Sequence, residues 1–196
     1  MIIIRGNSGC SVEIKDVESK KIVKKSSSDP AYYHRLQNQC KKQNSAFQKN
    51  ILEFIEIPKI INRKFLFEKD ICYFEMDFCR SLDCITFIHR CSIEEIEFLT
   101  SSITKFIDNS ISEAEFSKFE KEIFLLKYSS VKDNLKKSKF YKDIKARFSK
   151  IDKIFLSLSE IDIPKGFCHG DLTLSNILIK RKSRKICLID FLDTFL

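Results

Sequence analysis

Four polar residues near the carboxyl end of the chain lie close together, beside two apolar runs. His169, Asp171 and Asn176 fall within the stretch CHGDLTLSNILI, and Asp190 ends the run ICLID. The two apolar runs flank a short basic turn, which predicts a β-hairpin. A hairpin pairs residues across its turn, so Asn176 and Asp190 are expected to leave it at the same end. The pattern therefore predicts a compact polar site there.

The chemistry of this site depends on how closely Asn176 and Asp190 approach. If the turn centres on Ser183, Ile177 faces Ile189 and Asn176 faces Asp190, although a shift of one residue is also compatible with the sequence. Two hard oxygen ligands suit Mg²⁺, which takes few protein ligands and leaves positions for water and phosphate. Asp171 can reach the same space and accept a proton from an attacking hydroxyl. A general base and two metal ligands are the groups that enzymes use to transfer a phosphoryl group from a nucleotide.

Each of these residues has a simpler structural interpretation when it is taken alone. An isolated Asp or Asn at the end of a strand usually caps a turn. His169 is expected to be a packed, hydrogen-bonded loop residue rather than a catalyst. The functional interpretation depends on the ordered combination, in which H-G-D-x-x-x-x-N precedes an apolar strand, a basic turn and an apolar strand that ends in Asp.

The composition is typical of a soluble globular protein. The chain has 196 residues, of which 43% are hydrophobic and 32% charged, and this length suits one large domain or two small lobes. Its net charge is +8, and the only dense basic cluster is KRKSRK at 180–185, in the turn of the predicted hairpin. No basic stripe with interleaved aromatic residues is present, so a nucleic-acid partner is not favoured. A general attraction to anions, nucleotides included, is expected.

The cysteines and the apolar runs indicate the compartment. None of the 8 cysteines forms a CxxC pair, and several lie within apolar runs. We expect reduced thiols in a cytoplasmic protein. No stretch approaches the roughly 18 apolar residues of a membrane span, so no membrane partner is expected.

The first part of the chain predicts a sheet with one helix. Strand-like runs occupy residues 1–25, and a helix is expected over 29–53, with Asp29 as its N-cap and Pro30 at its first position. Residues 57–61 and 64–78 return to a strand-like composition with a polar turn at EKD. This part is predicted to form a lobe that ends near residue 78.

The second part, residues 79–196, predicts mostly helices with the hairpin among them. Two capping-box patterns, SIEE from Ser92 and SEAE from Ser112, each predict the start of a helix. Apolar residues at spacings of three and four predict a further helix over about 139–158. The whole is an α+β, two-lobed plan.

At these residues the sequence resembles the aminoglycoside phosphotransferase-like family, small-molecule kinases of the protein-kinase-like fold. His169-Gly170-Asp171 and Asn176 resemble its catalytic loop, and Ile189-Asp190-Phe191 resembles its metal-binding segment. The resemblance implies Asp171 as catalytic base, Asn176 and Asp190 as Mg²⁺ ligands, and a nucleoside triphosphate, ATP, as donor. It also implies a mostly β N-lobe over 1–78 and a mostly α C-lobe over 79–196.

The N-terminal part is consistent with this resemblance. The stretch GNSGCSV contains Ser8 and Gly9 where such folds place a loop over the phosphates. The strand KIVKK would carry the phosphate-binding lysine, either Lys24 or Lys25, of which Lys25 is preferred. Adenine would hydrogen-bond to backbone groups near Glu75–Asp77.

Two features depart from the family. Residues 35–47 contain no Glu to pair with the lysine, and Gln39 or Gln43 would stand in its place. The chain also stops six residues after Asp190, where the family continues with further helices. We therefore expect an incomplete C-lobe, from a fragment or a truncated product, or an acceptor site built from elsewhere. Apolar surface left exposed would favour aggregation or a homo-oligomer.

The leading hypothesis is an ATP- and Mg²⁺-dependent phosphotransferase that acts on a hydroxyl of a small metabolite, such as a sugar, amino sugar or amino alcohol. The alternative is a catalytically inactive nucleotide-binding or interaction protein of the same fold. A protein kinase is disfavoured because no activation segment follows Asp190. A basic RNA-binding domain would need affinity that falls steeply with salt.

Overall fold

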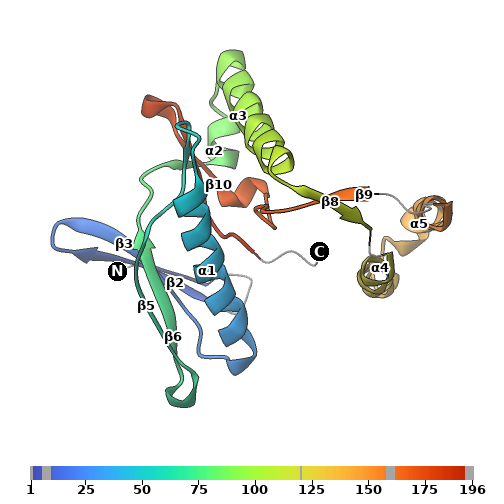
Figure 1. The fold of residues 1–196 in the computed structure, drawn as a ribbon, viewed down its shortest axis with the longest axis horizontal. Helices are drawn as coiled ribbons and strands as arrows, with labels where there is room; N and C mark the ends of the chain where they lie inside the picture. Colours follow the sequence, from blue (N-terminus) through green and yellow to red (C-terminus); the bar gives the residue numbers. More distant parts are fainter. Residues whose placement is uncertain (1, 6–9, 120, 158–161, 193–196) are drawn as a thin grey trace. The chain divides into compact units, whose positions relative to one another are not determined.

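The computed structural model describes residues 2–5, 10–119, 121–157 and 162–192 (Figure 1). The chain divides into two compact units. Unit 1 consists of Met1–Asp108 and Cys168–Asp193, and unit 2 consists of Asn109–Phe167 and Thr194–Leu196. The lobe boundary expected near residue 79 falls within unit 1 and stays a prediction. No helix among the described residues has the length and apolar character needed to cross a membrane.

An antiparallel sheet of five strands forms the first layer of unit 1, as the strand-like runs of 1–25 and 57–78 predict. The order across the sheet is β1-β2-β3-β6-β5. The polar turn at EKD is a 3-10 turn that ends at Asp70, which adopts a left-handed conformation. The strands are β1 Ile2–Arg5, β2 Ser11–Val17, β3 Lys20–Ser26, β5 Ile60–Leu66 and β6 Ile71–Asp77.

One long helix, α1 Tyr33–Lys49, packs against strands β5 and β6 of this sheet (Figure 1). A 3-10 turn, η1 Pro30–Tyr32, precedes it, and the Asp29 carboxylate accepts a hydrogen bond from Ala31 N at 3.0 Å. Asp29 and Pro30 thus cap and begin the 3-10 turn, whereas α1 itself begins at Tyr33 and ends at Lys49, inside the range predicted for the helix. The core between helix and sheet is built from buried apolar residues, chiefly Tyr33, Leu36, Cys40, Cys72, Phe74 and Met76. Their burial removes apolar surface from water and fixes the helix on the sheet.

A second sheet carries the predicted hairpin, with strand order β4-β11-β10-β7. The hairpin strands are confirmed as β10 Ile177–Lys180 and β11 Lys185–Leu188. They are flanked by β4 Ile55–Glu56 and β7 Leu82–Asp83, which are two residues each and too short to produce a pattern in the sequence. The short helix α2 Cys84–Ile88 follows β7.

The register of the hairpin differs from the predicted one by one residue. Ile177 pairs with Leu188, not Ile189, and Lys180 pairs with Lys185. The reason is a turn of four residues, in which a 3-10 turn over Arg181–Ser183 is followed by Arg184 in a left-handed conformation. An even-numbered loop has its centre between two residues, so Asp190 lies one position beyond the residue opposite Asn176.

Helix α3 Ile93–Ser112 begins where the first capping box predicts. Ser92 N donates to Glu95 Oε2 at 2.9 Å, and Glu95 N donates to Ser92 Oγ at 3.3 Å. The helix start predicted from the second capping box is wrong. Ser112 is the last residue of α3, and strand β8 Glu115–Lys118 follows it. This strand pairs with β9 Asp162–Lys165, in which the partner residues lie 44 to 50 positions further along the chain, so no local pattern reveals them.

Two further helices lie in unit 2, α4 Lys121–Lys136 and α5 Tyr141–Ser157. The helix predicted over 139–158 is therefore confirmed. Polar contacts join the two helices, since Tyr128 Oη donates to Asp152 at 3.0 Å and Lys132 Nζ lies 2.6 Å from the same carboxylate.

Candidate active site

The H-G-D loop is held against the segment that follows Asp190. Leu192 N donates to His169 O at 3.0 Å. Gly170 has a φ of +81°, and a Cβ at this position would collide with Leu192 O. Only glycine accepts both this backbone conformation and this close approach. The loop and the metal-binding segment predicted from the sequence are therefore brought side by side.

Asp171 and Asn176 lie in direct contact. The Asn176 amide nitrogen donates to Asp171 O at 2.9 Å and to Asp171 Oδ2 at 3.0 Å. A 3-10 turn over Leu174–Asn176 brings the two side chains together, and Asn176 is buried. Since both amide hydrogens are used, Asn176 Oδ1 is left as an oxygen that can accept or ligate.

His169 is a packed loop residue, as expected from the sequence. Its ring lies 4.2 Å from the ring of Phe191, and Nδ1 accepts a hydrogen bond from Asp171 N at 3.3 Å. Burial lowers the pKa of His169 to about 4, because the charged imidazolium would lose its hydration. The imidazole is therefore neutral at pH 7 and positions the backbone of Asp171.

Lys25 reaches the same site from the other sheet. Its ammonium lies 2.6 Å from Asp190 Oδ1, and its side chain is 5% exposed. Asp190 adopts a φ of +63°, which turns the chain sharply after β11. Lys24 points to the opposite face of β3, where its Nζ lies 4.5 Å from the centre of the Tyr73 ring. Of the two lysines considered, the structure brings only Lys25 to Asp190.

The other residues predicted to contact the nucleotide are Ser8, Gly9, Glu75 and Asp77. Ser8 and Gly9 lie outside the described residues. Glu75 and Asp77 are on β6, where Glu75 Oε2 accepts a hydrogen bond from Asn62 at 3.1 Å. The backbone N–H of Asp77 already donates to Lys59 O at 3.0 Å, and that of Phe78 donates to Lys21 O at 3.3 Å. A purine at this edge would thus need backbone groups beyond these two amides.

Helix α1 contributes Lys42, which the sequence analysis did not single out, and Gln39 and Gln43, which it did. Lys42 Nζ donates to Leu192 O, beside the position where a Cβ of Gly170 would lie. Nothing in the sequence distinguishes this lysine from many others. Gln39 is buried, and its Oε1 has no hydrogen-bond partner among the described residues. Gln43 instead donates to Pro58 O at 3.0 Å, so it serves the packing of α1.

Asn176 and Asp190 carry side-chain oxygens of the kind that a magnesium ion accepts as ligands. Among the described residues, no group of three or more His, Cys, Asp or Glu could hold a metal ion. Asn176 Oδ1 and the Asp190 carboxylate offer two hard oxygens at the base of the hairpin. Mg²⁺ takes few such ligands and completes its shell with water and phosphate.

Comparison with known proteins establishes the fold. No protein-family model matches the chain, and no curated protein matches it. Among solved structures, the apo form of a thermostable mutant of aminoglycoside phosphotransferase APH(4)-Ia matches with a TM-score of 0.64 at 12% identity, over 97% of this chain and 66% of that one. Another such mutant, in a ternary complex with AMP-PNP and hygromycin B, matches at 0.62 and 12%, over 97% and 65%.

Spectinomycin phosphotransferase APH(9)-Ia, in complex with ADP and spectinomycin, matches with a TM-score of 0.58 at 14% identity, over 97% of this chain and 62% of that one. The predicted α+β, protein-kinase-like fold of the aminoglycoside phosphotransferases is thereby confirmed. The chain spans 62–66% of the length of these three matched chains.

Proposed function

We propose that this chain is an ATP- and Mg²⁺-dependent phosphotransferase that acts on a hydroxyl of a small metabolite, such as a sugar, amino sugar or amino alcohol. One observation supports this most directly. Asp171, Asn176, Asp190 and Lys25 converge on one place in a fold shared with aminoglycoside and spectinomycin phosphotransferases. Membership of that family, like the cytoplasmic location and self-association, is part of the proposal.

Each residue has a role that its contacts allow. Asp171 uses Oδ2 to accept from Asn176, and its other oxygen is available to orient the acceptor hydroxyl and take its proton. Asn176 Oδ1 and Asp190 would hold Mg²⁺, which neutralises charge on the nucleotide phosphates. Lys25 would then turn from Asp190 toward a phosphate oxygen. His169, neutral and buried, keeps Asp171 in place.

One observation favours the alternative, an inactive nucleotide-binding protein. Helix α1 carries no acidic residue, and the family resemblance expects a Glu to pair with Lys25 where this chain offers the buried Gln39 or Gln43. Without that ion pair, Lys25 has Asp190 as its partner. Nucleotide binding without transfer to any acceptor would support this alternative.

The test is thermal unfolding with ATP, with and without Mg²⁺, combined with a phosphate-transfer screen over sugars, amino sugars and amino alcohols. A ligand at a hundred times its Kd should stabilise the fold by about 2.7 kcal/mol, or several degrees. Lys25→Ala should abolish the Mg²⁺-dependent shift. The neighbouring Lys24→Ala, which removes the same charge from the opposite face of β3, should leave it unchanged.

Asp171→Asn separates binding from catalysis, because its amide oxygen can still accept from Asn176. We expect this variant to keep the ATP shift and lose transfer. If the wild type responds to neither ATP nor GTP, the proposal fails. If it binds ATP but phosphorylates no acceptor and does not hydrolyse ATP, the inactive alternative is the better account.

A further inference from the structure

A cavity of about 280 Å³ lies beside the turn of the hairpin in unit 1. The four residues of β10 separate this turn from Asn176, which corresponds to roughly 13 Å along the strand. The cavity is therefore distinct from the candidate active site. We refer to it as the turn pocket, and it is lined by Phe87, Glu95, Phe98, Ile179, Arg181, Lys182 and Arg184.

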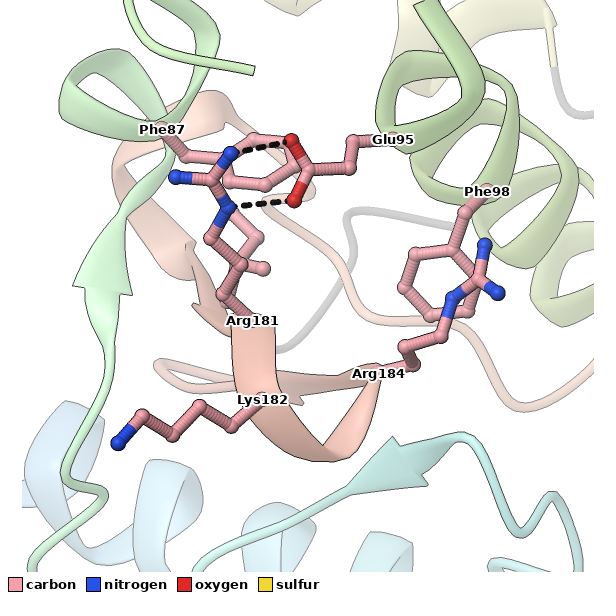
Figure 2. A pocket seen from close by; sticks show the side chains of 7 residues that line it. Phe87, Glu95, Phe98, Arg181, Lys182 and Arg184 are labelled. Carbon is pink, nitrogen blue, oxygen red and sulfur yellow. Dashed lines mark hydrogen bonds and ion pairs between the residues drawn. The ribbon is translucent and has the colours of Figure 1, made fainter. Parts of the chain in front are cut away.

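The walls of the turn pocket are aromatic and aliphatic. Phe87 of α2 and Ile179 of β10 are fully buried, and Phe98 of α3 is half-buried. Figure 2 shows Phe87 and Arg181 on one side and Phe98 and Arg184 on the other. Phe87, Phe98 and Ile179 are the apolar part of the lining, and the other four lining residues are charged. The walls favour a ligand with an apolar or aromatic part.

The two arginines of the pocket differ in what they already bind. The Arg181 guanidinium is already hydrogen-bonded within the chain. It pairs with the Glu95 carboxylate through two hydrogen bonds, with an Nη2–Oε2 distance of 2.7 Å (Figure 2), and it also donates to Arg90 O. The Arg184 guanidinium lies 5.4 Å from the centre of the Phe98 ring and donates to no described residue. Its donors are thus available to a carboxylate or phosphate.

The other charged groups leave Arg184 as the one that would hold an anion. Figure 2 shows the Lys182 ammonium directed away from Arg184, so this lysine adds no charge at the Arg184 guanidinium. Glu95 is paired with Arg181, and both Glu94 and Glu95 interact electrostatically with Arg184. The planar guanidinium of Arg184 still offers an anion a defined place.

The backbone of Arg184 has a φ of 49° and a ψ of 53°, in the left-handed region that glycine adopts easily. Four other non-glycine residues among those described also have a positive φ, so this conformation assigns no role by itself. It does allow the side chain to be removed by a change to glycine without straining the turn.

We propose that the turn pocket binds a small anion that carries an aromatic ring. The ring would lie between Phe87 and Phe98, and the phosphate or carboxylate would take the fork of Arg184. The volume suits a ligand with one ring, since drug-sized ligands occupy cavities of about 300–1,000 Å³. A loose peptide would need a longer groove than this cavity provides.

The experiment is a calorimetric titration of the whole chain with phenyl phosphate and with benzoate, compared with inorganic phosphate and with phenol. We expect phenyl phosphate or benzoate to bind at least ten-fold more tightly than inorganic phosphate or phenol. Arg184→Gly should weaken this binding at least ten-fold while the chain stays folded, because glycine accepts the backbone conformation of Arg184. Phe98→Leu, which keeps the apolar volume but removes the ring, should also weaken it.

Lys185→Ala is the matched control, because Lys185 is exposed, adjoins Arg184 and lies outside the pocket lining. It should leave binding unchanged. The proposal is overturned if Lys185→Ala and Arg184→Gly weaken binding equally, or if inorganic phosphate binds as well as phenyl phosphate. Displacement by ATP with Mg²⁺ would place the ligand in the candidate active site instead. Preference for a peptide containing Asp and Phe over both small anions would indicate a protein partner and also overturn it.

Discussion

Lys25 and Asp190 differ in how much of each side chain meets solvent, and this difference decides what their ion pair contributes. The Lys25 side chain is 5% exposed, whereas that of Asp190 is 33% exposed. An ammonium left alone in a buried position keeps its full desolvation cost, whereas a carboxylate that meets water recovers part of its hydration. The two halves of the pair are therefore not equivalent for stability.

We predict that Asp190→Asn destabilises the fold more than Lys25→Met does. Asparagine tolerates the left-handed backbone of Asp190, so the loss of charge is isolated. Asp190→Asn should lower the free energy of unfolding by about 2 kcal/mol, and Lys25→Met by about 1 kcal/mol or less. Urea unfolding at pH 7 measures both. Equal losses, or a larger loss for Lys25→Met, would contradict the buried ion pair.

The neutral His169 gives a second prediction, on pH. The unfolded chain takes up a proton near pH 6.5, but folded His169 does so only near pH 4, because burial lowers its pKa. The unfolded state thus binds more protons between these values. The free energy of unfolding should fall as pH is lowered from about 6.5 to 4, and His169 should account for about 3 kcal/mol of the fall. In His169→Asn, urea unfolding over this range should show a shallower decline; an unchanged slope would contradict it.

Much of the candidate site could be predicted from residue order alone. The spacing of Asp171, Asn176 and Asp190 is fixed by short connections, so a hairpin in either register brings them together. Contacts between distant segments could not be predicted in the same way. Lys42 and Gln39 are ordinary polar residues of an amphipathic helix, and only the packing of α1 against the H-G-D loop and the sheet shows what they face.

At the scale of elements, the two capping boxes form a natural pair for comparison. Both patterns place a Glu three residues after a Ser, yet only Ser92 begins a helix. Ser112 instead donates from its hydroxyl to Asn109 O at 2.9 Å, within the last turn of α3. The ladder between β8 and β9 prevails over the local pattern there, because it satisfies the backbone of residues 115–118.

We predict that Ser92→Ala destabilises the fold by about 1 kcal/mol, which is typical for the loss of an N-cap. The matched change, Ser112→Ala, should cost less than about 0.5 kcal/mol, because this hydroxyl caps no helix. Thermal unfolding followed by circular dichroism distinguishes the two. A loss at Ser112 equal to that at Ser92 would mean that the second box does act as a helix start.

The hairpin strands could be predicted from the sequence, but their pairing register could not. Its strands follow from two apolar runs around a basic turn, but the register depends on whether the loop has an odd or even number of residues. The four-residue loop ends at Arg184 in a left-handed conformation. Arginine is not a residue type from which a left-handed conformation is predicted. The strands were therefore predictable, whereas the pairing was not.

At the scale of the whole molecule, the candidate nucleotide contacts within the described residues all fall in unit 1. Lys25, Asp171, Asn176 and Asp190 belong to it, and so do Glu75 and Asp77. Unit 2 contributes none of the predicted site residues. The chain spans 62–66% of the length of the matched phosphotransferase chains.

This distribution yields a prediction for hydrogen exchange. ATP with Mg²⁺ should slow amide exchange in peptides that cover β3, the H-G-D loop and the hairpin, because a ligand bound only to the folded state suppresses local opening around its site. Peptides from α4 and α5 in unit 2 should change little. The comparison is made by mass spectrometry with and without the nucleotide, and Lys25→Ala serves as the control that removes the effect. Protection of α4 and α5 equal to that of the hairpin would mean that unit 2 takes part in the nucleotide site, and that the four residues of unit 1 do not suffice to form it.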